Sequence, residues 1–247
     1  MRGFLKLTII EFKLFLREPQ AAFFTLIFPL MMLFIFGSIY GNKPTPFFGG
    51  FGSVDVSVPS YTAIIIATSG LISLAIVLTS YRESGVLVRF QATPLNPLTV
   101  LAVEVIVLFT VTATGMALLI IAAKIVYGLR FAGNPLNVIA AFVLSCFSFF
   151  SFGFILAGLM PTVRTAQIVS MALFFPMIFL SGATIPREVL PNGIQKYSEF
   201  LPLTHVVNLL RGFWVGDGWG VHLKEVVILI SILVTGVIVS AKTFRWK

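Results

Sequence analysis

The sequence predicts an all-α integral membrane protein with six transmembrane helices, an N-terminal amphipathic interface helix and an external re-entrant helical segment before the last span. Of its 247 residues, 58% are hydrophobic and 11% are charged, and the mean hydropathy is +1.03. A soluble domain carries roughly 25% charged residues. The composition therefore excludes a water-soluble enzyme and a disordered chain, and the single cysteine, Cys146, excludes a disulfide scaffold.

Six apolar runs have the length of about 20 residues that one helical crossing needs. A polar loop rich in Gly and Pro is expected at residues 41–60, and a very short turn at 161–165. The runs predict spans at residues 21–40, 61–80, 100–126, 136–159, 166–181 and 226–244, which make residues 1–247 one transmembrane domain.

An even number of crossings places both termini on one side of the membrane. Lys and Arg are more numerous in the flanks that share a side with the N-terminus, and cytoplasmic flanks retain positive charge. We therefore expect both termini in the cytoplasm. The net charge of +8 lies at the ends of apolar runs rather than on one water-facing surface, so it indicates contact with lipid headgroups and not with nucleic acid.

Residues 1–18 are predicted to form a helix that lies in the headgroup plane until Pro19 breaks it. Basic residues follow one helical stripe, and apolar residues follow a neighbouring stripe. The basic stripe contains Arg2, Lys6, Lys13 and Arg17, with Glu18 at its end, and the apolar stripe contains Leu5, Ile9, Phe12 and Leu16. The alternative is a solvated basic segment that only sets the topology of the first span.

The connection between the second and third spans is predicted to contain a short helix. Val86, Leu87 and Phe90 share one helical face, and Pro94 and Pro97 end the helix. A rigid segment attached to two spans can transmit a push to both of them, whereas a flexible linker would absorb it. The alternative is an interfacial turn without a partner.

Residues 182–224 are expected to form the external re-entrant segment. Gly182 marks its start, and Pro186, Pro191 and Pro202 divide it into pieces too short to cross a bilayer. Broken helices at membrane depth are tolerated only where protein or a water-filled cavity covers the freed backbone groups. The alternative is an exposed helical cap that joins two spans.

The sequence predicts no catalytic residues, metal site or cofactor in this chain. It has no G-x-x-x-x-G-K-[ST] phosphate loop, and His205 and His222 have no neighbour at metal-ligand spacing. Glu104 and Lys124 are the ionisable residues inside the spans, which is too few for a proton or sodium pathway. The energy for any transport must then come from elsewhere.

Three stretches of the chain resemble permeases of type 2 ATP-binding-cassette exporters, a family that contains bacterial drug, antibiotic and polysaccharide exporters. They occur in the family's order. The first contains Arg17-Glu18-Pro19, Phe28-Pro29-Leu30 and Phe36-Gly37; the second contains Arg82-Glu83-Ser84-Gly85, Arg89 and Ala92-Thr93-Pro94; the third contains Leu180-Ser181-Gly182, Pro186, Leu190-Pro191, Leu201-Pro202-Leu203-Thr204 and Leu210-Arg211.

The resemblance implies a permease subunit in the cell membrane that pairs with a second copy or a sister permease. It also implies two separate cassette subunits that bind and hydrolyse ATP with Mg. Residues 1–18 would be the connecting helix and 83–92 the coupling helix, seated in a cleft of the cassette, with 161–165 as a smaller contact. The coupling residues would be Arg82, Glu83, Gly85, Arg89, Phe90, Ala92, Thr93 and Pro94. The short 41–60 loop implies no large extracytoplasmic domain.

The resemblance also implies a substrate path at the dimer interface, built mainly from the second and fifth spans. Phe174, Phe175, Met177 and Phe179 offer an apolar wall there, suited to an amphiphilic drug-like or lipid-like compound. Two other functions remain open: a carrier that works alone on an ion gradient, and a scaffold or membrane enzyme that transports nothing. Outward transport is implied by the resemblance alone.

Overall fold

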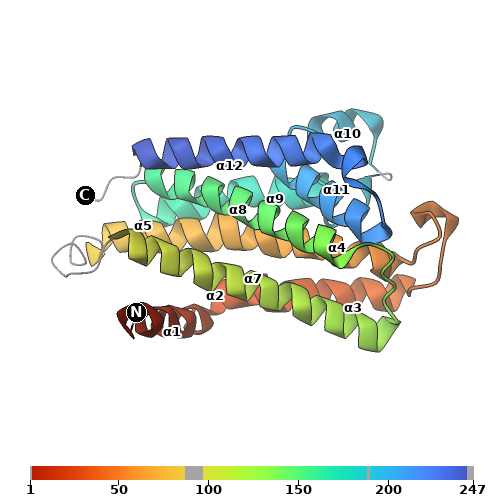
Figure 1. The fold of residues 1–247 in the computed structure, drawn as a ribbon, viewed down its shortest axis with the longest axis horizontal. Coiled ribbons are helices and arrows are strands. Elements are labelled where there is room, and N and C mark those ends of the chain that lie inside the picture. The colour runs from red at the N-terminus through yellow and green to blue at the C-terminus, as the bar shows by residue number, and fades with distance from the viewer. Residues whose placement is uncertain (1, 87–96, 188–189, 244–247) are drawn as a thin grey trace.

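The computed structural model describes residues 2–86, 97–187 and 190–243, and these ranges are mostly helical and contain no strand (Figure 1). Six helical stretches are long and apolar enough to cross a membrane, which confirms the predicted all-α architecture with six spans. The helix at residues 2–17 and the end of the helix at residues 223–243 lie at the same end of the molecule, and the loop that follows residue 40 lies at the opposite end (Figure 1).

The first span follows α1 (Arg2–Arg17) and consists of α2 (Pro19–Ala22), η1 (Phe23–Ile27) and α3 (Phe28–Tyr40). The chain has the wider π-helical form in η1, which ends two residues before Pro29. Proline lacks the N–H that would bond to the carbonyl four residues earlier, which is the carbonyl of Thr25, and its ring crowds that carbonyl. A widened turn accommodates this crowding without ending the helix.

The second span is the centre of the molecule. It consists of α4 (Ser53–Ala67), η3 (Thr68–Leu74) and α5 (Ala75–Glu83). In an apolar stretch of 18 residues of this span, 89% of the residues are buried, whereas 11% are buried in the corresponding stretch of the last span. The second span is therefore enclosed by the other helices of the same chain.

The expectation that residues 41–60 form one loop is wrong in its second half, because α4 begins at Ser53. The polar residues that indicated a loop instead complete the start of this helix. The carboxylate of Asp55 accepts hydrogen bonds from the backbone N–H of Gly52 at 2.9 Å and of Arg130 at 2.8 Å, and from Asn42 Nδ2 at 2.8 Å. Only η2 (Pro46–Phe48) is helical within the shorter loop.

The remaining spans are α7 (Pro97–Tyr127), α8 (Pro135–Leu159), α9 (Val163–Leu180) and the pair formed by η5 (Trp219–His222) and α12 (Leu223–Thr243). Helix α8 packs against both α12 and η3, and α1 packs against α7. This arrangement brings the ends of α1, α5, α7, α8 and α9 together at the end of the molecule that carries the termini (Figure 1).

The segment 182–224 contains two further helices, α10 (Asn192–Ser198) and α11 (Pro202–Val215). Pro191 stands directly before α10, and Pro202 is the first residue of α11, where a missing N–H costs nothing. Helix α11 is enclosed by α4, α8 and α12, and none of its residues is exposed. It is thus an interior helix of the bundle and not an exposed cap; its depth in a membrane stays a prediction.

Candidate coupling site

Three consecutive residues at the end of α5 contact four other helices. Tyr81 reaches α1 and α7: its hydroxyl oxygen lies 2.6 Å from Glu11 Oε2 and 2.7 Å from Glu104 Oε1. A phenol has one proton and donates it to one carboxylate at a time. The hydroxyl of Tyr81 thus lies within hydrogen-bonding distance of one carboxylate on α1 and one on α7.

Arg82 binds the end of α8. Its Nη1 donates to the carbonyl oxygens of Ala157 at 2.8 Å and Gly158 at 3.3 Å, and its Nη2 donates to the carbonyl of Met160. The last carbonyls of a helix have no partner within the helix and carry partial negative charge. The guanidinium of Arg82 supplies both the missing donors and the opposite charge.

Glu83 binds the start of α9. Its Oε2 accepts a hydrogen bond of 2.6 Å from the backbone N–H of Val163, the first residue of that helix. The Thr162 hydroxyl accepts a second bond, from the Thr165 N–H at 3.2 Å. A carboxylate at a helix N-terminus is stabilised by the free N–H groups and by the helix dipole.

The structure thus brings together two segments that were predicted as separate contacts, the stretch that begins at Arg82 and the turn at 161–165. The end of α5 is hydrogen-bonded to backbone groups at both the end of α8 and the start of α9. Gly85 has a φ of +68°, a conformation that favours glycine, where the chain leaves α5. The predicted coupling residues Arg89, Phe90, Ala92, Thr93 and Pro94 lie outside the described residues, as does most of 83–92.

Helix α1 presents more faces than the two predicted stripes. Lys6, Lys13 and Arg17 are exposed, and so are Leu5, Ile9 and Leu16 of the apolar stripe. A third face, not foreseen, packs against α7. It contains Phe4, Leu7, Glu11 and Phe15, together with Phe12 of the predicted apolar stripe. Contact of the exposed apolar stripe with lipid stays a prediction.

Tyr81, Arg82 and Glu83, with the residues that they contact, are called the coupling cluster below. A pocket of about 340 Å³ lies beside it. The pocket is lined by Glu11, Glu18, Tyr81 and Glu104 together with apolar side chains of α1, α5 and α7. Burial raises the pKa of Glu18 above its usual value. In the described part of the chain, no group of three His, Cys, Asp or Glu residues is arranged to hold a metal ion.

Glu104 stands out in the sequence as an ionisable residue inside a predicted span, whereas Glu11 and Tyr81 were not predicted as site residues. Two signals were present in the chain itself. A carboxylate within an apolar span needs a partner, and Glu11 is the single acidic residue within Arg2–Arg17. What the sequence could not show is that residues 70 positions apart meet.

The predicted substrate-path residues lie on two sides of α9. Phe174 and Met177 are buried in the bundle, with 1% and 5% of their surface exposed, whereas Phe175 and Phe179 are 44% and 47% exposed. Neighbouring residues of a helix point about 100° apart, so the four cannot form one wall. The second span, also predicted to line the path, is enclosed within the chain.

The predicted residues of the re-entrant segment lie at the opposite end of the molecule from the coupling cluster. Gly182 has a φ of +88°, which permits the turn that ends α9. Gly182 and Pro186 line a pocket of about 480 Å³ with Phe36, Tyr61 and Arg211. The structure does not bring these residues near Arg82 or Glu83.

Comparison with known proteins agrees with this architecture. Nodulation protein J of Sinorhizobium fredii is 32% identical over 119 residues, which cover 46% of this chain and 44% of that protein. The probable multidrug ABC transporter permease YbhR of Escherichia coli is 26% identical over 161 residues, 65% of this chain and 44% of that protein. The inner membrane transport permease YhhJ of Escherichia coli is 23% identical over 180 residues, 70% of this chain and 48% of that protein.

The matched regions span less than half the length of each of these relatives. A sequence profile of the family described as ABC-2 type transporter covers much more of the chain and matches residues 2–213. Together with six apolar helices, this match shows a multi-pass membrane protein with the features of a transport permease. The chain therefore belongs to the ABC-2 type transporter family.

Proposed function

We propose that the chain is the membrane-spanning permease subunit of an exporter that is driven by a separate cassette subunit, which binds ATP and Mg. The observation that carries this proposal is the set of contacts made by Tyr81, Arg82 and Glu83. They join the start of the predicted coupling helix to four other helices. A permease that is driven by a separate ATPase needs such a connection, because the conformational change of the ATPase must be transmitted to the membrane helices.

The proposed mechanism is a push on residues 83–92 by the cassette when it closes on ATP. Arg82 passes the displacement to α8 and Glu83 passes it to α9, because both side chains bind backbone groups at helix ends and not mobile side chains. Tyr81 passes it to α1 and α7. The connected spans then move together as rigid helices, and the substrate path opens on the outer side.

The proposed assembly is a dimer with a second copy or a sister permease, embedded in the lipid of the cell membrane with both termini in the cytoplasm. The exposed apolar face of α9, which includes Phe175 and Phe179, is the proposed seam. The proposed cargo is an amphiphilic drug-like or lipid-like compound. The apolar surface of the spans supports it, as does the name of one relative, a probable multidrug ABC transporter permease.

The test is reconstitution of the chain with the cassette ATPase that co-purifies from native membranes. Arg82→Ala and Glu83→Ala remove the contacts with α8 and α9, so transport should fall about tenfold or more while ATP hydrolysis by the cassette continues. Arg89→Glu should weaken binding of the cassette itself. Lys242→Ala, an exposed cation on α12 at the same end of the molecule, is the matched control and should transport normally.

Unchanged transport in Arg82→Ala, Glu83→Ala and Arg89→Glu would contradict the proposal. So would the absence of any ATP-hydrolysing partner.

A carrier that works alone on an ion gradient is the second candidate, because Glu104 is a buried carboxylate inside a span. It predicts transport in liposomes without any ATPase, which Glu104→Gln abolishes. Neither transport nor cassette binding would indicate a scaffold or a membrane enzyme.

A further inference from the structure

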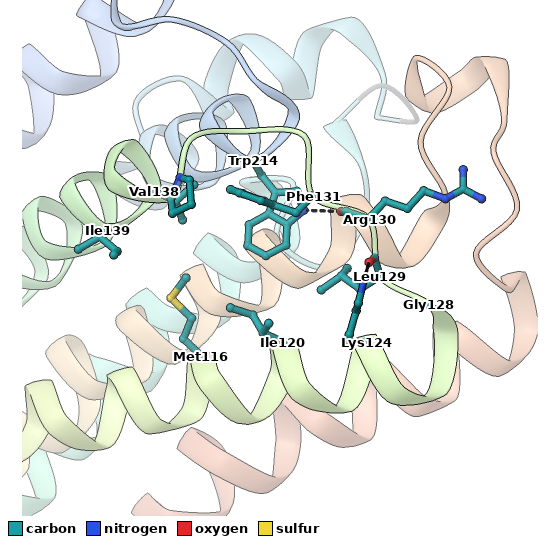
Figure 2. Close-up of a pocket in the computed structure, with 11 residues that line it drawn as sticks. Met116, Ile120, Lys124, Gly128, Leu129, Arg130, Phe131, Val138, Ile139 and Trp214 are labelled. Carbon is teal, nitrogen blue, oxygen red and sulfur yellow. Dashed lines mark hydrogen bonds between the residues drawn. The ribbon is translucent and has the colours of Figure 1, made fainter.

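A cavity of about 770 Å³ lies between α7, α8 and α11, at the end of the molecule opposite the termini. Met116, Ile120 and Lys124 project into it from one side of α7, and the linker from Gly128 to Phe131 closes its outer end (Figure 2). Val138 of α8 and Trp214 of α11 form the other walls. The deep part of the cavity is apolar.

The outer wall is held in place before any ligand binds. The rings of Phe131 and Trp214 meet edge to face with centroids 4.8 Å apart. The indole Nε1 of Trp214 donates to the carbonyl of Arg130 at 3.2 Å, so its single donor is already satisfied (Figure 2). The N–H of Arg130 donates to Asp55 at 2.8 Å, which ties the linker to α4.

Positive charge is confined to the mouth of the cavity. Lys124 Nζ donates to the carbonyl of Leu129 at 3.2 Å, and the Arg130 guanidinium extends from the linker away from the cavity (Figure 2). No acidic residue is among those that line the cavity. In the described part of the chain, neither cation forms a salt bridge; Asp55 approaches Arg130 only through the backbone N–H.

The cavity borders an apolar surface that no helix in the described ranges covers. Ile125 on α7 and Leu136 on α8 flank it with 78% and 74% of their surface exposed, and Ile139 in its wall is also exposed. Both helices are membrane spans by length and hydropathy. Such a surface faces lipid chains, so a molecule in the bilayer can enter the cavity sideways.

We propose that this cavity binds an anionic phospholipid, with one acyl chain between α7 and α8 and the phosphate at the mouth beside Lys124, where the Arg130 guanidinium adds positive charge on the outer side of the linker. An acyl chain fills apolar space that would otherwise lose dispersion contacts. A phosphate supplies the anionic acceptor that Lys124 lacks, and charge-assisted hydrogen bonds are roughly twice as strong as neutral ones. In the proposed orientation, the lipid belongs to the outer leaflet.

The size of the cavity and the position of the charge together favour a lipid over a small polar anion. A free phosphate would use the mouth and leave the apolar walls empty. Ligand sites of about 300–1,000 Å³ bury most of a drug-sized molecule, and this cavity is of that size. The proposal concerns the chain alone and does not depend on the proposed coupling to an ATPase.

The test is native mass spectrometry of the purified chain, exchanged into detergent with equal amounts of phosphatidylglycerol and phosphatidylcholine of matched chains. The wild-type chain should retain phosphatidylglycerol about tenfold better, which corresponds to about 1.4 kcal/mol. The double variant Lys124→Ala, Arg130→Ala should lose this preference. Lys124→Arg should keep it, and Lys43→Ala, which removes a cation at the same end but outside the cavity, should have no effect.

A second pair of measurements separates the acyl chain from the headgroup. Ile120→Trp fills the apolar part and should lower the retention of both lipids, with unchanged helical circular dichroism as the check on folding. Phosphatidylglycerol with a photoactivatable acyl chain should crosslink the wild-type chain between residues 116 and 139. Equal retention of the two lipids by the wild-type chain, an unchanged preference in the double variant, or crosslinks confined to other helices would overturn the proposal.

Discussion

At the scale of single residues, the hydroxyl of Tyr81 is the group on which the coupling cluster depends. It is the polar partner of Glu104, a carboxylate with only 3% of its surface exposed, and it also contacts Glu11 on α1. A buried polar group that loses its partner costs about 1–3 kcal/mol, and more when it is charged. The hydrogen bonds of Tyr81 that join α5 to α1 and α7 thus stabilise the fold, and they also lie on the proposed route of force transmission.

Tyr81→Phe is expected to lower the free energy of unfolding by about 1–3 kcal/mol, because the aromatic ring stays and only the hydrogen bonds are lost. Thermal unfolding of the purified chain, followed by circular dichroism, measures this. Tyr197→Phe is the matched control, since Tyr197 is 74% exposed. Equal midpoints for the two variants would show that the cluster adds nothing to stability.

A second residue-scale prediction concerns Glu199, which joins the segment before the last span to α12. Lys224 Nζ donates to Glu199 Oε2 at 2.9 Å and holds the pKa of that carboxyl below its usual value of 4.5. Because the folded pKa is the lower one, the stabilisation is present above pH 4.5 and is lost as the pH falls through the folded pKa. Glu199→Gln should therefore unfold at a lower temperature than wild type at pH 7, and the difference should vanish in acid.

Salt provides the control for this pair, because both groups are exposed and their attraction is screened within about 3 Å at 1 M ionic strength. The difference between wild type and Glu199→Gln at pH 7 should shrink in 1 M salt. A difference that persists both in acid and in high salt would mean that the ion pair is not its cause.

At the scale of elements, η3 and α8 pack backbone against backbone at two glycines. A Cβ added at Gly70 would lie 2.6 Å from the carbonyl oxygen of Phe149, and one added at Gly153 would overlap the carbonyl oxygen of Gly70. Small residues allow membrane helices to approach this closely, and van der Waals contact then supplies much of their attraction. The enclosed position of the second span depends on this approach.

Gly153→Ala is expected to lower the free energy of unfolding by about 1–3 kcal/mol, because the added methyl group meets backbone that cannot move aside. Gly115→Ala is the control within another span: its Cβ would lie 3.1 Å from Ile65 Cδ1, the end of a flexible side chain. Unfolding of both variants in denaturant measures the effect. An equal change in the two would indicate a general cost of alanine and not close packing.

At the scale of the whole molecule, the enclosure of the second span restricts where a second permease can pack. Helix α9 has an exposed face that contains Ile168, Phe175 and Phe179. In the second span, by contrast, 89% of an apolar stretch of 18 residues is buried. A seam between copies must use surface that the chain leaves open. The fifth span therefore remains available for the proposed dimer, and the second span does not.

In a Cys146→Ser background, Phe175→Cys should form crosslinks between copies in membranes treated with a mild oxidant. Val234→Cys is the matched control on α12, where Val234 is 50% exposed and also apolar. Gel electrophoresis without reductant reads out the crosslinked dimer. Crosslinking at Val234 and not at Phe175 would place the seam on α12 instead.

Several features could be predicted from the sequence because they depend on local properties of the chain. The all-α class and the number of spans follow from runs of apolar residues, since a bilayer demands about 20 of them per crossing. The expected ends of the spans differ most from those in the structure at the start of α4, where the polar residues from Ser53 to Ser60 resemble a loop. They form helix because Asp55 caps the chain and meets the linker after α7.

The family resemblance likewise rested on short stretches of sequence, and the profile match to residues 2–213 confirms it. Only the tertiary structure decided which span is enclosed, which face of α9 stays open and which partners Tyr81, Arg82 and Glu83 find. The contacts with Glu11, Ala157 and Val163 each join residues 70 or more positions apart in the sequence. Hydropathy records how apolar a segment is, but the direction in which a side chain points is set by the helices that pack around it.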